Sequence, residues 1–83
     1  MHLEIVTPDK MVFEGEVTSA TFPGSQGIFQ VLENHAPIIS SLAKGALIYV
    51  DEVGSHTLQV DGGVVEVLKN KIIVLAESAV EAE

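Results

Sequence analysis

Cysteine is absent from the 83 residues of this chain. Without cysteine, a chain forms no disulfide, binds no metal through thiolates and has no cysteine nucleophile. The length fits one domain. A domain of this size buries about 60–65% of its unfolded surface, so stability must come from one compact apolar core.

Aromatic residues are scarce, and there is no tryptophan. The four that occur are Phe13, Phe22, Phe29 and Tyr49. Hydrophobic residues nevertheless make up 47% of the chain, which is typical of a globular protein and excludes a disordered one. The core must therefore consist mainly of valine, isoleucine and leucine, the residues that suit a pleated sheet.

Positive charge is also scarce, with four lysine or arginine residues against twelve acidic ones and a net charge of −8. Such a surface repels the phosphates of nucleic acid and the headgroups of anionic lipid. We therefore expect no nucleic-acid partner and no direct membrane binding. A basic protein partner fits this charge.

Long hydrophobic runs are missing as well. The longest aliphatic run, Ile72 to Ala76, is far shorter than the ~20 residues that span a bilayer. The amino end, "MHLEIVTPDK", carries charge from Glu4 onward and does not resemble a secretory signal. These features predict a soluble protein whose association with membranes, if any, is indirect.

What the chain does contain is a series of short apolar segments separated by turn residues. We expect strands at 2–7, 17–22, 46–50, 56–60, 64–68 and 71–76, with turns that include Lys44-Gly45 and Asp61-Gly62. Asp-Gly between two alternating segments is the strongest local hairpin signal. Strands at this spacing indicate an all-β sandwich or barrel.

The last residues have a different composition. The segment "AESAVEAE", from Ala76 to Glu83, is rich in helix formers, so it either begins a helix or forms a frayed tail. We therefore divide the chain into a β-sandwich domain over residues 1–77 and a short polar tail over residues 78–83.

Motifs for chemistry are not evident. No phosphate-binding G-x-x-x-x-G-K-[ST] string occurs. His2, His35 and His56 have no partner at a typical zinc-ligand spacing. Glu14 and Glu16 share one strand face, but a solvated rim explains them better than an acid–base pair. The sequence thus predicts no catalytic, cofactor-binding or metal site.

Two other classes of small β protein share some of these features. Lipoyl and biotinyl domains carry a modified lysine at a hairpin tip, and Lys10 follows a turn here. Their lysine lies between two similar halves, however, whereas Lys10 is near the start and no internal similarity is visible. A ligand-binding β-sandwich is the second alternative, and it would need a concave pocket with convergent polar groups.

The segment from Gly24 to Ile39, "GSQGIFQVLENHAPII", is the most unusual. Its glycines and Asn34 permit backbone conformations that other residues avoid, and Ala36-Pro37 favours an extended exit. Alternation places Phe29 and Val31 on one side and Ile28 on the other. The segment is therefore either a partner-binding surface or a fifth core strand.

Four blocks of the sequence, in order, are shared with a known family: "LEIVTPDKMVFEGEV" (3–17), "PGSQGIFQVLENHAPIISSL" (23–42), "VDGGVVEV" (60–67) and "NKIIVLAESA" (70–79). Together they resemble the ε subunit of F-type ATP synthases, from Leu3 to about Ala79. His35-Ala36-Pro37 and the Gly62-Gly63 pair followed by Glu66-Val67 are the most specific parts.

The resemblance implies a ten-stranded β-sandwich of two antiparallel sheets in the central stalk of a proton-translocating enzyme. Such a subunit is not catalytic and holds no cofactor. It joins the γ shaft to the membrane c-ring, so that proton flow is coupled to ATP synthesis. Its implied location is the cytoplasmic face of the bacterial inner membrane, as a peripheral part of the complex.

The resemblance also implies two sets of contact residues. One set, expected at the c-ring, is Gly24, Ser25, Gln26, Gly27, Ile28, Phe29, Leu32 and His35. The other set, expected at the γ subunit, is Thr7, Ser40, Leu42 and Ala46.

Some positions depart from the family pattern. Ile28 stands where an acidic residue is common, and Gln30 stands in place of a glycine. Glu33-Asn34 replaces Pro-Gly, and Ala43-Lys44-Gly45 replaces Lys-Pro-Gly. Most members continue into a carboxy-terminal helical hairpin. We expect a chain that ends at Glu83 to be a short form without inhibition by that hairpin and without its ATP site.

Overall fold

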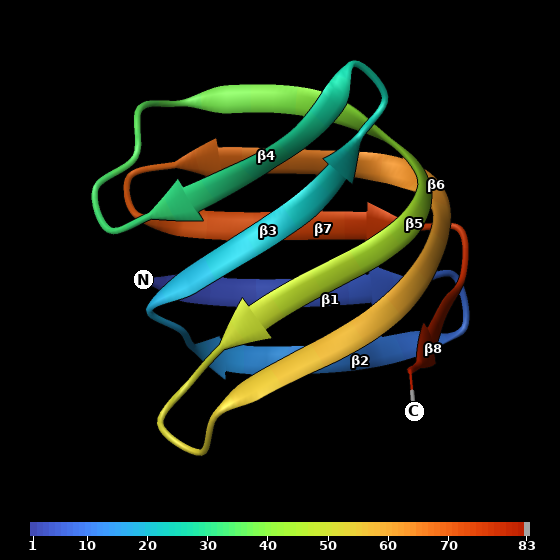
Figure 1. The fold of residues 1–83 in the computed structure, drawn as a ribbon, viewed down its shortest axis with the longest axis horizontal. Helices are drawn as coiled ribbons and strands as arrows, with labels where there is room; N and C mark the ends of the chain where they lie inside the picture. The colour runs from blue at the N-terminus through green and yellow to red at the C-terminus, as the bar shows by residue number, and fades with distance from the viewer. Residues whose placement is uncertain (83) are drawn as a thin grey trace.

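The computed structural model describes residues 1–82, and these residues form eight β-strands and no helix (Figure 1). The described part of the chain thus includes no helix long and apolar enough to cross a membrane. The strands are β1 (His2–Thr7), β2 (Lys10–Glu16), β3 (Ser19–Gly24), β4 (Gly27–Leu32), β5 (Ile38–Val50), β6 (Ser55–Leu68), β7 (Lys71–Ala76) and β8 (Ala79–Glu81).

The strands form one sheet in the order β2-β1-β7-β6-β5-β3-β4, and β8 pairs with β6. The two long strands, β5 with 13 residues and β6 with 14, curve from one layer of a sandwich to the other, as Figure 1 shows at the right. The back layer is β2, β1, β7 and the adjoining halves of β6 and β5. The front layer is β4, β3 and the other halves of β5 and β6, with β8.

The all-β sandwich predicted from the sequence is confirmed. Counted by layer, five strand segments lie on each side, because β5 and β6 each contribute to both. The chain itself has eight strands in residues 1–82 rather than ten, since neither long strand is interrupted at the corner.

One strand pair departs from the expected antiparallel arrangement. β1 and β7 pair in parallel, with His2 opposite Lys71 and Val6 opposite Leu75. Parallel neighbours need a long crossover connection. Here that connection includes β2 and the strands β3 to β6, which build most of the front layer before the chain returns to the back layer beside β1.

The expected hairpin at Asp61-Gly62 is wrong, because β6 continues through these residues. Gly62 and Gly63 have positive φ angles of 79° and 131°, so the two glycines bend β6 at the corner instead of reversing it. The expected turn at Lys44-Gly45 likewise lies inside β5, directly opposite this bend. Paired glycines at a sheet corner give the same sequence signal as a hairpin turn.

The expectation of a helix or frayed tail after residue 77 is also wrong. Ala79–Glu81 forms β8, in which Ala79 pairs with Val60 and packs against the core. A helix of this length is unstable alone, whereas the edge of β6 offers hydrogen-bonding groups to an extended chain. Residue 83 of the expected tail lies outside the described residues.

The core lies between the two layers and is aliphatic, as the composition predicted. The largest fully buried side chains are Phe22, Leu3, Ile5, Leu47, Ile72, Val31, Val60, Val65, Val67 and Val74. They occupy inward positions on six strands, β1, β3, β4, β5, β6 and β7, and come from both layers, so the two inner faces pack against each other.

Candidate docking surfaces

The first candidate surface is the outer side of β4. Ile28 is 80% exposed and Leu32 is 52% exposed, while Val31 is fully buried between them. Phe29 points inward and lies 5.5 Å from the ring of Phe22. The predicted alternation is confirmed, with one side of the strand in the core and the other side exposed. We call Ile28, Gln30 and Leu32, which share the exposed side of β4, the β4 surface.

The turn before β4 is held in a defined shape. Gly24 is buried, and a Cβ atom there would lie 2.6 Å from the carbonyl oxygen of Gly27. Gly24 therefore shapes the turn and presents no side chain to a partner. Ser25 donates its backbone N–H to Ser41 at 3.0 Å, and the two hydroxyls also contact each other. Gln26 and Gly27 are exposed at the tip.

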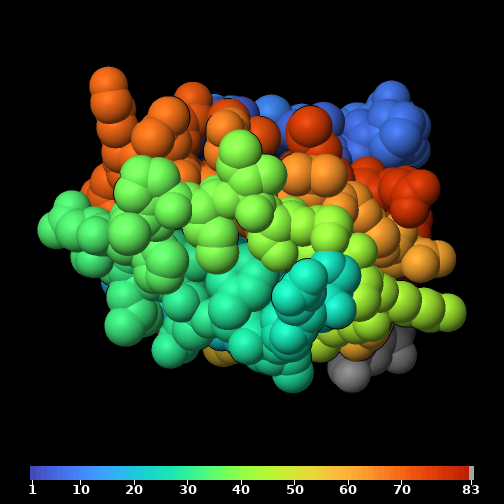
Figure 2. All heavy atoms as spheres, turned by 90° about the horizontal axis from the view of Figure 1, so that it is seen from above, coloured from blue at the N-terminus to red at the C-terminus, as the bar shows by residue number. Residues whose placement is uncertain are grey.

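The segment after β4 is a second tight turn. Asn34 has a φ of 62°, the left-handed conformation expected from its type, and its N–H donates to Asn70 Oδ1 at 2.9 Å. His35 is half-buried, and its N–H donates to the carbonyl of Leu32 at 3.1 Å. Ser25 and His35 thus flank opposite ends of β4. Figure 2 shows the segment from about residue 25 to residue 45 covering much of the face seen from above.

The four residues expected at γ do not form one exposed patch. Thr7 and Leu42 are each only 6% exposed, and the Thr7 hydroxyl donates to Asp9 Oδ1 at 2.6 Å. Ser40 and Ala46 are half-buried in different parts of β5. Thr7 and Leu42 offer little side-chain surface to any partner that docks on this domain.

The structure reveals a second surface that the sequence interpretation missed, on the outer side of the back layer. Strand register aligns Val64, Leu75 and Val6 in one row, and Ile39 and Ile73 lie in the next. Ile39 is 72% exposed, Leu75 is 56% exposed and Val64 is 44% exposed. We call these five residues the apolar face. Four of them, Ile39, Val64, Ile73 and Leu75, line a hollow of about 190 Å³ together with Glu66.

A signal for this surface was present in the sequence. β7 reads "KIIVLA", so both its inward and its outward positions are apolar. A strand with one solvated side normally alternates apolar and polar residues, whereas a strand covered on both sides reads as a continuous apolar run. The run from Ile72 to Ala76 therefore indicated a strand that needs a cover on its outer side.

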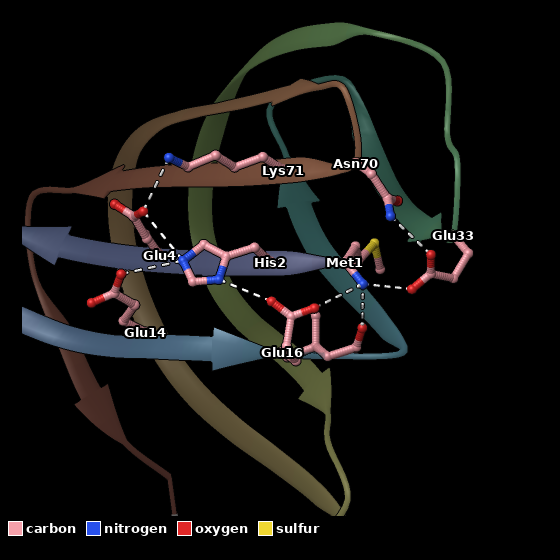
Figure 3. A network of polar contacts seen from close by, with 9 residues as sticks. Met1, His2, Glu4, Glu14, Glu16, Glu33, Asn70 and Lys71 are labelled. Carbon is pink, nitrogen blue, oxygen red and sulfur yellow. Dashed lines mark hydrogen bonds and ion pairs between the residues drawn. The ribbon is translucent and has the colours of Figure 1, made fainter.

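The other end of the same outer side is charged. His2 lies among Glu4, Glu14 and Glu16, as Figure 3 shows, and Lys71 contacts Glu4 at 3.3 Å. The hydrogen bond to Glu16 is the main cause that raises the pKa of His2 above its ordinary value. Beside this group, the Met1 amine contacts Glu16 and Glu33, and Glu33 accepts from Asn70 at 3.0 Å.

A hollow of about 470 Å³ lies between β2 and β8. Tyr49 lines it and stacks on His56 with ring centroids 5.0 Å apart. His56 contacts Asp51 at 3.0 Å, and this hydrogen bond is the main cause that lowers the pKa of Asp51. Lys10 and Glu81 stand at its rim. Burial, more than any nearby charge, raises the pKa of the Tyr49 hydroxyl.

Fold and surfaces together define a small β-sandwich domain with exposed apolar side chains on the outer sides of both layers. The family model that describes the β-sandwich domain of the ATP synthase delta/epsilon chain matches residues 1–82. The chain belongs to this family. The resemblance noted from its sequence motifs is confirmed.

Relatives support the same assignment. The chain is 49% identical over 83 residues to the ATP synthase epsilon chain of Nitratidesulfovibrio vulgaris strain DP4, covering all of this chain and 62% of that protein. It is 42% identical over 76 residues to the ATP synthase epsilon chain of Chlorobium limicola, covering 90% of this chain and 86% of that protein. The chain thus spans about three fifths of the length of the first relative and most of the second.

Solved structures show the same fold. A chain of the Euglena gracilis mitochondrial ATP synthase, determined with its OSCP/F1/c-ring assembly, superimposes with a TM-score of 0.88 at 24% identity, covering 95% of this chain and 51% of that one. A chain of the Tetrahymena thermophila mitochondrial ATP synthase central stalk and c-ring gives a TM-score of 0.80 at 17% identity, covering 96% of this chain and 65% of that one.

Proposed function

We propose that this chain is a rotor subunit of the central stalk of a proton-translocating F-type ATP synthase. It joins the γ shaft to the membrane c-ring and supports the coupling of proton flow to ATP synthesis. It is a structural component of that enzyme and is not itself catalytic. The observation that carries the proposal is the pair of exposed apolar surfaces on the outer sides of opposite layers.

The apolar face is the surface proposed for γ. Exposed patches of this kind, rimmed by polar groups, mark protein interfaces on soluble domains. Thr7 and Leu42 lie at the edge of this region rather than in it. Thr7 follows Val6 at the end of β1, and Leu42 pairs with Gly63, directly beside Val64. We therefore propose that Ile39, Leu75 and their neighbours make the γ contact, with Thr7 and Leu42 beside them.

The β4 surface and its flanking turns are the surface proposed for the c-ring. Ser25, Gln26 and Gly27 present an exposed turn, and Ile28 and Leu32 add apolar contact area beside it. Phe29 supports this strand from inside, and His35 closes its far end. Ile28 stands where an acidic residue is common in the family, so we propose an apolar contact with the ring at this position.

The charge of the chain favours this assignment. A net charge of −8 suits basic loops on a protein partner and opposes direct binding to anionic lipid. We therefore propose a peripheral location on the cytoplasmic face of the bacterial inner membrane, reached only through the complex. No cofactor takes part in this role.

Co-purification from native membranes tests the proposal. The chain is expressed with an affinity tag in its own cells, the membranes are dissolved in a mild detergent, and the tagged chain is recovered. We expect mass spectrometry to identify the γ subunit and the c subunit at amounts close to those of the tagged chain. Recovery of the chain without either subunit would overturn the proposal.

The hollow between β2 and β8 is the candidate site for the alternative function, a ligand-binding β-sandwich. Its volume lies within the range of small-molecule sites, and Lys10, His56 and Glu81 supply polar groups. Native mass spectrometry of the recovered chain distinguishes the two functions. A stoichiometric small molecule on a chain that lacks γ and c would favour the ligand-binding module.

A further inference from the structure

His2, Glu4, Glu14 and Glu16 project from the outer side of two adjacent strands. His2 and Glu4 are two residues apart on β1, and the antiparallel register places them opposite Glu16 and Glu14 on β2. Residues that pair directly across two strands point to the same face. Strand pairing thus gathers one imidazole and three carboxylates, as Figure 3 shows, although no two of these four are adjacent in sequence.

The spacing of three of these groups matches the size of a metal coordination shell. His2 Nε2 lies 3.3 Å from Glu4 Oε2 and 3.3 Å from Glu14 Oε2, and all three ligand atoms lie within 4.8 Å of one another. With metal–ligand distances near 2.0–2.1 Å, the ligand atoms of a tetrahedral zinc site are about 3.3 Å apart. Two of the three edges are therefore already of the required length.

The remaining imidazole nitrogen is held by another carboxylate. His2 Nδ1 lies 3.0 Å from Glu16 Oε2. When Nδ1–H donates to a carboxylate, the proton is fixed on that nitrogen and the lone pair of Nε2 points to the metal. This is the outer-shell arrangement that commonly orients a histidine ligand. It separates this group from an ordinary cluster of acidic side chains.

We propose that His2, Glu4 and Glu14 bind a divalent transition-metal ion of the zinc class, with Glu16 as the positioning residue for His2. The donor set of one imidazole nitrogen and two carboxylate oxygens suits such an ion, and water completes its shell. The bound ion joins β1 to β2 at the charged end of the outer side whose other end is the apolar face. This inference is independent of the proposed rotor function.

Lys71 is expected to lower the affinity of the site for the metal ion. Its Nζ lies 3.3 Å from the same Glu4 Oε2 that faces His2, so the ammonium competes with the metal for that oxygen. Its side chain is half exposed and can turn toward solvent without disturbing the core. Replacing Lys71 by glutamine is therefore expected to tighten metal binding, an effect that a purely structural ion network would not produce.

Isothermal titration of the untagged chain with Zn²⁺, and separately with Co²⁺, tests the site in a mildly alkaline buffer. We expect one ion per chain, a visible Co²⁺ spectrum typical of low coordination number, and a rise in melting temperature with Zn²⁺. His2→Gln and Glu14→Gln should abolish saturable binding. Glu16→Gln should weaken it by about 10–100-fold, as for other groups that hydrogen-bond a ligating histidine.

His56→Gln is the matched control, because it removes another strand histidine that contacts a carboxylate outside this group. It should bind the ion as the parent chain does. Circular dichroism of each variant verifies folding. The proposal is overturned if the parent chain shows no saturable binding, if His2→Gln binds like the parent, or if Lys71→Gln loses binding.

Discussion

At the scale of single residues, the exposed fraction of the side chain separates surface residues from core residues within the same segment. Ile28 and Val31 have similar chemistry and lie three positions apart on β4. The first is 80% exposed and the second is fully buried, because neighbouring side chains alternate across a strand. Ile28 is therefore available for the proposed contact, whereas Val31 belongs to the core.

Ile28→Asp should leave the domain folded. Its side chain has few contacts to lose, so we expect the free energy of unfolding to change by about 1 kcal/mol or less. Binding to a purified c-ring should weaken, because the apolar contact is replaced by a charge. Urea unfolding and a ring-binding assay measure the two effects.

Val31→Asp on the same strand is the control for that prediction. It places a charge in the core, which should cost several kcal/mol and unfold much of the population. If Ile28→Asp proved as destabilising as Val31→Asp, the assignment of Ile28 to an exposed surface would be wrong.

At the scale of elements, the corner of β6 is the feature on which the two-layer arrangement depends. Gly63 has a φ of 131°, and a Cβ atom there would lie 2.2 Å from the carbonyl oxygen of Leu75 and 2.8 Å from Ala76 Cα. Only glycine allows β7 to approach the bend this closely. The same two glycines that suggested a hairpin thus permit a continuous strand.

Gly63→Ala should be strongly destabilising, with Gly27→Ala as the matched comparison. Gly27 has nearly the same φ, 133°, but no atom lies within 4 Å of a Cβ placed there. Gly27→Ala should therefore cost only the backbone strain, about 1–3 kcal/mol. Gly63→Ala adds a clash with backbone atoms of β7 and should cost clearly more in thermal or urea unfolding. Equal losses in the two variants would refute the close-approach argument.

At the scale of the whole molecule, the two proposed docking surfaces lie on opposite layers, so they can be disrupted separately. Leu75 belongs to the apolar face in the back layer, and Ile28 belongs to the β4 surface in the front layer. The core lies between them. Substitutions more than about 10 Å apart without shared partners act independently.

Leu75→Glu should weaken binding to the isolated γ subunit by more than about 10-fold, the effect of roughly 1.4 kcal/mol of lost contact free energy. It should leave binding to the c-ring unchanged. Ile28→Asp should show the reverse pattern. Surface-immobilised γ and detergent-purified c-ring provide the two measurements, and a variant that lost both interactions equally while still folded would contradict the two-surface arrangement.

The sequence by itself determined the aliphatic β class, the positions of β1 and β7, the alternation within β4 and the left-handed turn at Asn34. These features depend on local periodicity and on the φ preferences of single residues. A few residues adjacent in sequence are enough to determine both. The family motifs were equally readable, because they are strings of adjacent residues.

Only the tertiary structure decided how β5 and β6 cross between layers, why β1 lies parallel to β7 and why residues 79–81 extend as β8. Each depends on a partner strand far along the chain. The same holds for the apolar face and for the meeting of His2 with Glu14, because strand register decides which side chains share a surface. Local patterns determine which residues of one strand share a side. The pairing between strands decides which residues of different strands lie next to each other on a surface.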